Sequence, residues 1–354
     1  MGRQHFHTFD ALRFSSFLLV FLHHLPKTGN IWIDFFLKSG GIGVSFFFVL
    51  SGFLITYILL YEKKNRQTIS FKKFFIRRIL RIWPLFYLMI AFAFLSPYLL
   101  QLFGINSANN GYKPNLLVSM LFVENYRMML TDTFPDGAPL RIMWTLCIEE
   151  HFYLLWGILL YFISVKNVPL LIFAAIVIAN IARPIYSTVG IKHLDVFSNF
   201  DYFAFGALPA YILLFKNKFM VAIDKIPVLT KHTFLLLTTC FVFIIPNVAD
   251  LDTAYFWAPT LFCLLFSTLI LFTLSKNNIY IQDDLWYSRL GKYTYGLYLY
   301  HTIVLLLALH IFKPYSIISW CILTLISLII TCIISSASYH LFEKQFLKLK
   351  RFYY

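Results

Sequence analysis

Apolar stretches long enough to cross a lipid bilayer recur along the whole chain. A transmembrane helix needs about 20 mainly apolar residues, and fewer where polar side chains face a protein interior. By this measure the sequence predicts ten spans, of which the fourth and the sixth have the weakest signal. They cover residues 9–25, 42–61, 82–103, 143–163, 169–189, 200–215, 232–248, 255–274, 293–312 and 317–342. We therefore expect an all-α polytopic membrane protein, with residues 1–354 forming a single domain and no appended soluble domain.

One connection is much longer than the others. Residues 104–142 join the third and fourth spans, and their apolar run, 116–130, is shorter than a full span. Runs of this length are more often re-entrant or interfacial than membrane-spanning. We predict that this segment lies on the outer side of the membrane and acts as a lid.

The composition supports the same class of protein. Hydrophobic residues make up 60% of the chain and charged residues 13%, whereas soluble chains are about 45–50% apolar and about 25% charged. So few charges could not cover the surfaces of soluble domains, which excludes a soluble globular protein.

The distribution of Lys and Arg predicts the orientation. The net charge is +14, but the basic residues occur in short connections and not in one stripe, which argues against nucleic acid as a partner. Cytoplasmic connections hold the excess of Lys and Arg. The first connection has only Lys27 and Lys38. The second has Lys63, Lys64, Arg66, Lys72, Lys73, Arg77, Arg78 and Arg81. Both termini are therefore predicted to be cytoplasmic.

The first predicted span carries polar side chains on one face. Successive side chains of a helix are turned by about 100° around its axis. Measured around that axis from His24, Arg13 lies about 20° to one side and Asp10 about 40° to the other. His23 points about 100° away from His24. Placing a titratable group inside a membrane span is costly, so such a group indicates a functional site. A neutral imidazole there can act as a general base for a hydroxyl. The alternative is that the two histidines anchor the helix end at the membrane interface.

Two arginines precede the third span. Arg78 and Arg81 are three residues apart and so share a helix face. Two guanidinium groups placed in this way can bind phosphates bidentately, which lysines do less well. The alternative is an ordinary basic anchor on the cytoplasmic side.

Two adjacent carboxylates, Glu149 and Glu150, lie in an apolar segment near the outer side. At least one of them should be paired or protonated. One could orient a histidine, and the alternative is structural pairing with an arginine. Further polar residues in or beside the spans are Ser51, Arg183, Asp201, His301 and Glu343.

Six short motifs, in a fixed order along nearly the whole chain, resemble the acyltransferase-3 family of integral-membrane O-acyltransferases, which modify surface glycans in bacteria. They are FDALR at 9–13 followed by His24, FFFVLSGF at 46–53, Arg78-x-x-Arg81-x-x-Pro84, WTLxxEExFY at 144–153, YGLYLYH at 295–301, and Glu343-Lys344. The family has ten helices, in agreement with the number of apolar stretches.

The resemblance implies an enzyme that transfers an acetyl group from cytosolic acetyl-CoA to a hydroxyl of a lipid-linked or exported surface polysaccharide, such as O-antigen, capsule or exopolysaccharide. It implies the inner, cytoplasmic membrane of a bacterium, and no metal is expected. By resemblance His24 takes the catalytic position and Arg13 supports it, and we expect Glu149 or Glu150 to orient the imidazole. Contacts with the donor are assigned to Arg78, Arg81, Asp10 and Ser51, and contacts with the acceptor to Asn125, Tyr126, Trp144, Asp201, His301 and Glu343.

The chain departs from the family pattern in three places. Members often have Asn-Trp where this chain has Asn125-Tyr126, and an Arg two residues before the Asp where this chain has Asn199 before Asp201. Some members carry an extracellular hydrolase-like domain after the last helix, and this sequence ends at Tyr354. We therefore expect the protein to complete acetyl transfer alone or with a separate partner.

The expected mechanism assigns donor and acceptor to opposite sides of the membrane. The donor phosphates would bind Arg78 and Arg81, and a glycan hydroxyl would lose its proton to His24 as it attacks the thioester carbonyl. A covalent acetyl-histidine route is the chemical alternative. The rival function is a glycan or lipid transporter, such as a flippase, whose intramembrane charges line a path. The expected partners are the glycan acceptor and membrane lipids, and the oligomeric state stays open.

Overall fold

The computed structural model describes residues 6–102, 111–249, 254 and 256–353, and within them it is all-α. A single isolated bridge, between Tyr112 and Pro135, is the only β pairing in these ranges. Each of the ten predicted spans overlaps one α-helix, and the last, 317–342, continues into the π-helical turn that follows α15. The helices, in chain order, are α1 (Thr8–His23), α2 (Ile31–Leu37), α3 (Gly40–Arg66), α4 (Phe71–Leu102), α5 (Leu116–Met120), α6 (Glu124–Thr131), α7 (Trp144–Phe162), α8 (Val168–Thr188), α9 (Phe200–Phe215), α10 (Asn217–Asp224), α11 (Val228–Val248), α12 (Ala258–Leu274), α13 (Trp286–Gly291), α14 (Thr294–Ile311), α15 (Ile317–Ser338) and α16 (Lys344–Leu349).

Shorter helical turns complete the fold. Three are 3₁₀ turns, at Leu140–Ile142, Val165–Asn167 and Lys350–Tyr353. A π-helical turn, Tyr339–Glu343, joins α15 to α16.

Six helical segments among the described residues are long and apolar enough to cross a membrane, and α9 with α10, bent by 100°, would make a seventh. The segments are Ile31–Arg66, Phe71–Leu99, Val165–Thr188, Val228–Val248, Thr294–Ile311 and Ile317–Tyr353. The other predicted spans coincide with α1, α7 and α12, which do not meet this test of length and composition. α1 has only 16 residues and α12 has 17, while α7 carries two adjacent glutamates.

The chain folds into two compact units, each described by itself. Unit 1 comprises Met1–Ile69, Phe152–Ile185 and Phe197–Thr294. Unit 2 comprises Ser70–His151, Tyr186–Val196 and Tyr295–Tyr354.

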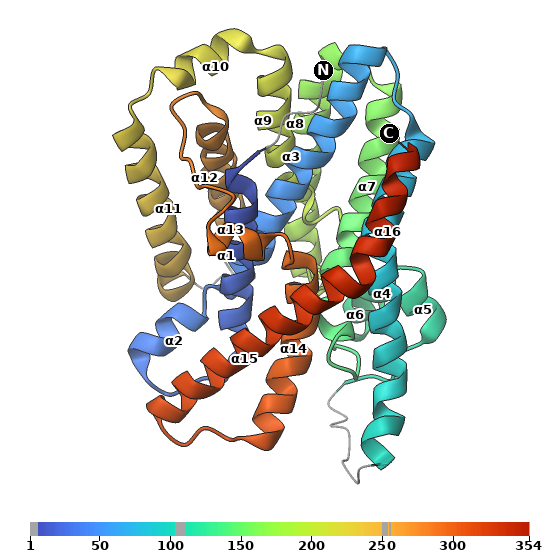
Figure 1. The fold of residues 1–354 in the computed structure, drawn as a ribbon. Helices are drawn as coiled ribbons and strands as arrows, with labels where there is room; N and C mark the ends of the chain where they lie inside the picture. Colours follow the sequence, from blue (N-terminus) through green and yellow to red (C-terminus); the bar gives the residue numbers. More distant parts are fainter. Residues whose placement is uncertain (1–5, 103–110, 250–253, 255, 354) are drawn as a thin grey trace. The chain divides into compact units, whose positions relative to one another are not determined.

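Unit 1 is built around α3, which packs against α1, α9 and α12 (Figure 1). Glycines allow α3 and α9 to touch along their backbones. A Cβ added at Gly52 of α3 would lie 2.1 Å from the carbonyl oxygen of Phe203, and one added at Gly206 of α9 would lie 2.0 Å from that of Val49. Small residues of this kind let helices pack closely in a membrane, where apolar lipid gives no hydrophobic drive for association.

The same device holds α1 in place within unit 1. A Cβ at Gly43 of α3 would lie 2.5 Å from the Ser16 carbonyl oxygen, and one at Gly291 of α13 would lie 1.8 Å from the Asp10 carbonyl oxygen. Ser15 and Tyr287 add a hydroxyl–hydroxyl contact of 2.7 Å between α1 and α13. The backbone of α1 is therefore fixed on two sides.

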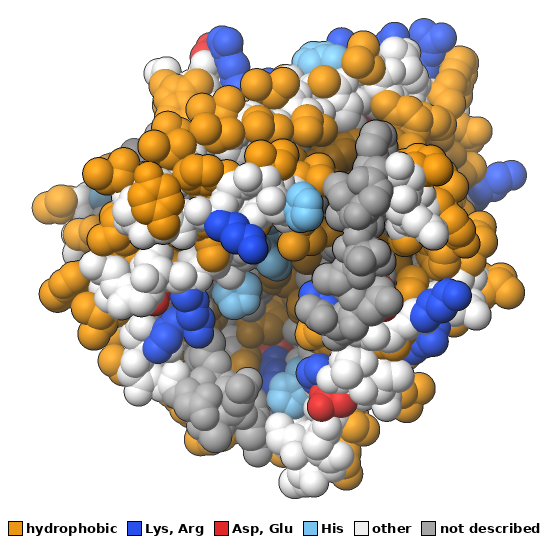
Figure 2. All heavy atoms as spheres, turned by 90° about the horizontal axis from the view of Figure 1, so that it is seen from below, with side chains coloured by type: hydrophobic (Ala, Val, Ile, Leu, Met, Phe, Trp, Pro, Cys, Tyr) orange, Lys and Arg blue, Asp and Glu red, His pale blue; other side chains and the backbone are white. Residues whose placement is uncertain are grey.

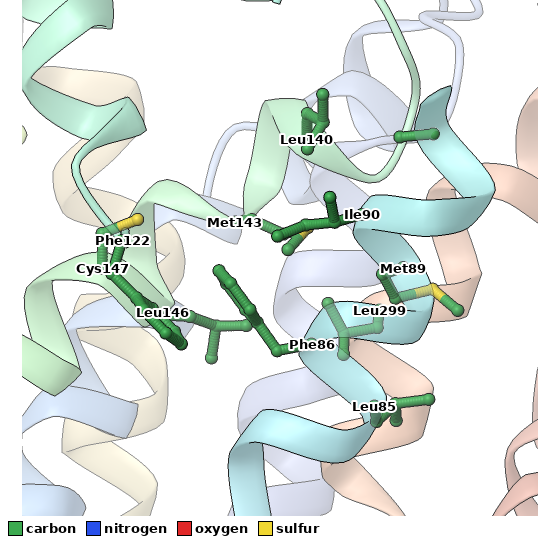
Figure 3. Packing of buried hydrophobic residues seen from close by; sticks show 11 residues of the cluster. Leu85, Phe86, Met89, Ile90, Phe122, Leu140, Met143, Leu146, Cys147 and Leu299 are labelled. Carbon is green, nitrogen blue, oxygen red and sulfur yellow. The ribbon is translucent and has the colours of Figure 1, made fainter. Parts of the chain in front are cut away.

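Unit 2 has a continuous apolar core (Figure 3). α4 contributes Leu85, Phe86, Met89, Ile90 and Ala93, and the other buried members are Phe122, Leu140, Met143, Leu146, Cys147 and Leu299. The rings of Phe86 and Phe122 stack with centroids 3.9 Å apart. This core joins α4, α7 and α14 to the long connection.

The described part of the long connection, residues 111–142, is compact. The apolar run 116–130, predicted as one re-entrant or interfacial segment, forms two short helices, α5 and α6, with Phe122 between them at φ 59°. The Tyr112 amide donates to the Phe134 carbonyl at 3.2 Å, and the Asp136 amide donates to the Tyr112 carbonyl at 2.9 Å. These bonds close the segment into a loop. Residues 104–110 of the predicted lid lie outside the described residues, and its role as a lid stays a prediction.

The surface pattern of α15 is typical of a helix that faces lipid. Its exposed side carries Ile318, Leu325 and Ile333, while its buried side carries Ser327 and Thr331. The exposed face of α15 is therefore apolar, and its small polar side chains are buried together with Trp320 and Leu323. Figure 2 shows the same preference on the face viewed there, where hydrophobic side chains predominate and Lys and Arg occur singly or in small groups.

The glycine contacts lead to a test of the packing in unit 1. Gly52→Ala forces α3 and α9 apart, and overpacking of this kind typically costs about 1–3 kcal/mol of stability. We expect a clearly lower melting temperature for this variant, measured by thermal unfolding of the purified protein in detergent. The matched control is Gly41→Ala on the same helix, because a Cβ at Gly41 would meet no atom within 4 Å. Equal melting temperatures for the two variants would contradict the packing described here.

Candidate active site

The first helix presents an ion pair near its start. Nη1 of Arg13 donates to Oδ1 of Asp10 at 2.5 Å, and both side chains are largely buried. The two residues are three positions apart, as the predicted helical stripe requires. The pair therefore belongs to α1 itself and is held in place by the packing of α1 against α3 and α13.

His24 lies directly after the last residue of α1. Its Nδ1 atom is 2.8 Å from the carbonyl oxygen of Val20. Because a carbonyl oxygen only accepts hydrogen bonds, Nδ1 carries the proton, and Nε2 bears the lone pair of the neutral imidazole. This is the tautomer in which Nε2 can take a proton from a hydroxyl.

The two adjacent histidines differ in their surroundings. His24 is half-buried, whereas His23 is exposed. Their rings are perpendicular, with centroids 5.5 Å apart. The two side chains therefore differ in exposure, and the shared face of His24 with Arg13 stays a prediction. The catalytic role of His24 and its support by Glu149 or Glu150 stay predictions.

Two other predicted residues of unit 1 lie on α3 and α9. The Ser51 hydroxyl is 3.4 Å from the Tyr153 hydroxyl. Asp201, expected to contact the acceptor, forms a buried ion pair with Arg183 of α8 and accepts a hydrogen bond from the Tyr202 amide. Arg183 also donates from Nε to the Ser198 carbonyl at 2.8 Å. In this structure the Asp201 carboxylate therefore joins α8 to α9.

Unit 2 contains the predicted phosphate-binding arginines and the glutamate pair. The Trp83 indole donates to Oε2 of Glu150 at 3.4 Å, and the charge of Arg78 acts on the same carboxylate. Oε1 of Glu150 is buried and has no hydrogen-bond partner in the described ranges. α4 therefore directs Trp83 toward the first half of α7.

A buried carboxylate organises the long connection. Glu124 accepts hydrogen bonds from the Tyr112 hydroxyl at 2.6 Å and from the Ser119 hydroxyl at 2.5 Å. Burial and the neighbouring carboxylate raise the pKa of Tyr112 well above its usual range, so the phenol stays protonated and donates. Arg127 lies over the Tyr112 ring, 4.5 Å from its centroid.

The predicted acceptor residues Asn125 and Tyr126 follow on α6. Asn125 is fully buried and donates to the Leu194 carbonyl at 2.8 Å, while its Oδ1 atom has no partner within the part of unit 2 that is described. The Tyr126 ring stacks on His151 with centroids 5.4 Å apart. Burial, together with the charge of Asp195, raises the pKa of Tyr126. The site therefore offers an aromatic pair beside an amide oxygen that can accept a hydrogen bond.

The remaining predicted residues also belong to unit 2. Trp144 begins α7. His301 is fully buried on α14, with Nδ1 2.6 Å from the Tyr298 carbonyl oxygen, which again places the proton on Nδ1. Glu343 is buried in the π turn and accepts a hydrogen bond from Ser338 at 3.3 Å.

Three residues near these sites make contacts that the sequence analysis did not predict. They are Arg183, Glu124 and His151. The partnership of Arg183 with Asp201 depends on two different helices, although a charge inside a span signals that a partner exists. Glu124, a lone carboxylate within an apolar run, carried the same signal. His151 directly follows Glu150, and this position is the only sign in the sequence that it belongs to the candidate site.

The chemistry available is thus divided between the units. Unit 1 holds an imidazole whose tautomer suits a general base, and unit 2 holds arginines suited to phosphates and a polar, aromatic region suited to a hydroxylated ligand. No group of three or more His, Cys, Asp and Glu side chains suited to a metal ion occurs among the described residues.

Comparisons with known proteins give the relatives of this chain. The peptidoglycan O-acetyltransferase OatA of Listeria monocytogenes is 28% identical over 323 residues, which are 85% of this chain and 49% of the relative. The putative peptidoglycan O-acetyltransferase YrhL of Bacillus subtilis is 27% identical over 358 residues, which are 95% of this chain and 54% of the relative. A putative O-acetyltransferase of Staphylococcus aureus is 32% identical over 155 residues, 43% of this chain and 24% of the relative.

The chain spans about half the length of the first two relatives. No solved structure matches it. Residues 6–336 match the acyltransferase 3 family, which is described as an acyltransferase domain. This range contains α1, the arginines of α4 and the Glu149-Glu150 motif, and the chain therefore belongs to the acyltransferase 3 family.

Proposed function

We propose that this protein is a membrane O-acetyltransferase that moves an acetyl group from cytosolic acetyl-CoA to a hydroxyl of a cell-envelope glycan. The family supports acyl transfer, and the names of the relatives support an acetyl group. The observation that carries the proposal is the state of His24, whose Nδ1–H bond to Val20 makes Nε2 the basic nitrogen.

The acceptor class is the next part of the proposal. Two relatives are named for peptidoglycan, which makes peptidoglycan the first acceptor to test. A lipid-linked or exported polysaccharide is the other candidate. Both present secondary or primary hydroxyls that a general base must deprotonate as they attack an acyl group.

The proposed reaction is a direct acyl transfer. Nε2 of His24 takes the proton of the acceptor hydroxyl while the oxygen attacks the thioester carbonyl carbon. The C–O bond forms, the C–S bond breaks, and the CoA sulfur leaves with the electron pair and takes the proton from Nε2 of His24, which gives the thiol and restores the neutral imidazole. Arg78 and Arg81 bind the donor phosphates, and Asp10 holds Arg13 on the same face of α1 as the base.

We further propose ten spans with both termini on the cytoplasmic side of the inner membrane. The loop charges support this orientation, and the six segments that can cross a membrane account for most of the spans. α1 and α12 would cross as short helices surrounded by protein, which a membrane domain tolerates because their polar groups are satisfied internally.

The decisive experiment is to mix purified protein with acetyl-CoA and an envelope glycan. We expect thiol release together with a glycan heavier by the mass of one acetyl group, detected by mass spectrometry. If the protein neither binds acetyl-CoA nor releases thiol, the acyltransferase proposal is wrong and a transporter becomes the better explanation.

The two histidines give a sharp test of the general base. His24→Ala should reduce acetyl transfer by roughly 10²–10⁴-fold, the usual contribution of a general base, while donor binding stays largely intact. His23→Ala is the matched control and should cost much less, because that side chain is exposed and on another face. An inactive His23→Ala variant beside an active His24→Ala variant, at equal expression, would move the base to the other residue.

The arginines are tested by conservative replacement. Arg78→Lys with Arg81→Lys keeps the charge and the membrane orientation but removes the bidentate forks. We expect weaker binding of acetyl-CoA, measured by titration of the purified protein, with normal membrane insertion. Unchanged donor affinity in the double variant would show that these arginines serve only as basic anchors.

The orientation can be tested with single cysteines and an impermeant thiol reagent. Cysteines at Asn65 and Asn217 should be labelled only after the cytoplasmic side is opened, because the basic connections lie there. A cysteine at the exposed Thr133 should be labelled in intact cells. Labelling of Asn65 in intact cells would invert the proposed topology.

A further inference from the structure

The last helical turns of unit 2 pack along the arginine-bearing start of α4. α16 and the 3₁₀ turn Lys350–Tyr353 both contact α4, and Figure 1 shows α16 beside it. Nη1 of Arg77 donates to the Tyr353 carbonyl at 2.6 Å, and the Arg77 side chain is buried. This bond ties the 3₁₀ turn to α4 one residue before Arg78.

The packing brings a fourth basic side chain to the arginines. Lys350 begins the 3₁₀ turn and is half-buried. The positive charges of Arg77, Arg78 and Arg81 repel its ammonium group. The ammonium makes no hydrogen bond or ion pair with any described residue. By contrast, Lys348 is exposed and donates to Gln345 at 3.0 Å.

Two carboxylates of unit 2 interact electrostatically with the arginines. The positive charge of Arg81 attracts the Glu343 carboxylate of the π turn, and the positive charge of Arg78 attracts the Glu150 carboxylate of α7. π turns often occur at functional sites, because the extra residue redirects the following turns. Here the π turn precedes α16 and so sets the position from which Lys350 approaches α4.

Four cationic groups held together repel one another, and the repulsion is larger away from bulk water. Basic residues that only mark the cytoplasmic side would lie apart and exposed, as Lys348 does. A half-buried ammonium on a turn packed against the arginine-bearing start of α4 is instead the arrangement expected where an anion with several charged oxygens binds. Arginines contribute planar forks for such a ligand, and a lysine contributes a compact point charge.

We propose that Lys350, together with Arg78 and Arg81, forms a phosphate-binding site, and that its ligand is the phosphate-bearing nucleotide part of the acyl donor. Arg77 acts as a positioning residue, since its bond to the Tyr353 carbonyl holds the turn that presents Lys350. This inference rests on the proposed function and adds to it a residue from the opposite end of the sequence. An anionic lipid headgroup shares the same chemistry, and the experiment separates the two.

The experiment compares Lys350→Gln, Lys350→Arg and Lys348→Gln in the full chain. Binding of CoA is measured by calorimetry, and acetyl transfer is measured with acetyl-CoA and with S-acetylpantetheine, a thioester without phosphates. Loss of one hydrogen bond to a charged group should weaken CoA binding by roughly tenfold to a hundredfold in Lys350→Gln. Lys350→Arg should restore most of the affinity, and Lys348→Gln should match the parent. The KM for S-acetylpantetheine should not change in any variant.

Three results would overturn the inference. If the parent binds CoA and Lys350→Gln binds it equally well, Lys350 is not part of the site, and the proposed acetyltransferase stands. If Lys350→Gln loses only binding to nanodiscs of phosphatidylglycerol, compared with phosphatidylcholine, the ligand is a lipid headgroup. If the parent neither binds CoA nor releases thiol, the proposed function fails along with the inference. Equal melting temperatures of the variants in detergent exclude misfolding as the cause of a loss.

Discussion

Polar side chains inside apolar helices must find their partners within the protein, because the bilayer core offers none. Much of the tertiary structure follows from this constraint. Arg183 and Asp201 join α8 to α9. The fully buried Lys231 of α11 donates to the Ser275 hydroxyl and the Asn277 carbonyl, both at 2.7 Å, after the end of α12. Glu124 gathers two hydroxyls of the long connection. In unit 1, polar contacts thus fix which helix surfaces meet, and glycine contacts determine how closely they approach, while an apolar core does this work in unit 2.

The sequence predicts most securely what depends on neighbours along the chain. The predicted span 169–189 coincides with α8, and the shared stripe of Asp10 and Arg13 follows from helical spacing, whereas their ion pair was not predicted. The break between α5 and α6 was not predicted, because it depends on Phe122 adopting a positive φ and stacking on Phe86 of α4. Helix existence is encoded by local apolar runs, whereas such breaks are decided by the packing of distant segments.

The candidate site shows the same division. Hydropathy treats His23 and His24 alike, but helical geometry separates them, and their different exposure agrees with that argument. The partner of Asp201 could not be predicted, because Arg183 is on another helix. In the sequence Lys350 is only one of several basic residues near Tyr354, and the packing of the last turns on α4 is what brings it to the arginines.

The position of His24 at the end of α1 has an electrostatic consequence. The last carbonyl groups of a helix carry a partial negative charge, and a cation placed there is stabilised, typically by about 0.3–1 kcal/mol. In the proposed reaction the imidazole becomes an imidazolium when it takes the acceptor proton and stays so until it gives that proton to the leaving sulfur. The Val20 carbonyl, which already accepts the Nδ1 proton, would hold that cation in its productive orientation. A turn of peptide backbone would then perform the supporting task that many hydrolases assign to a carboxylate side chain.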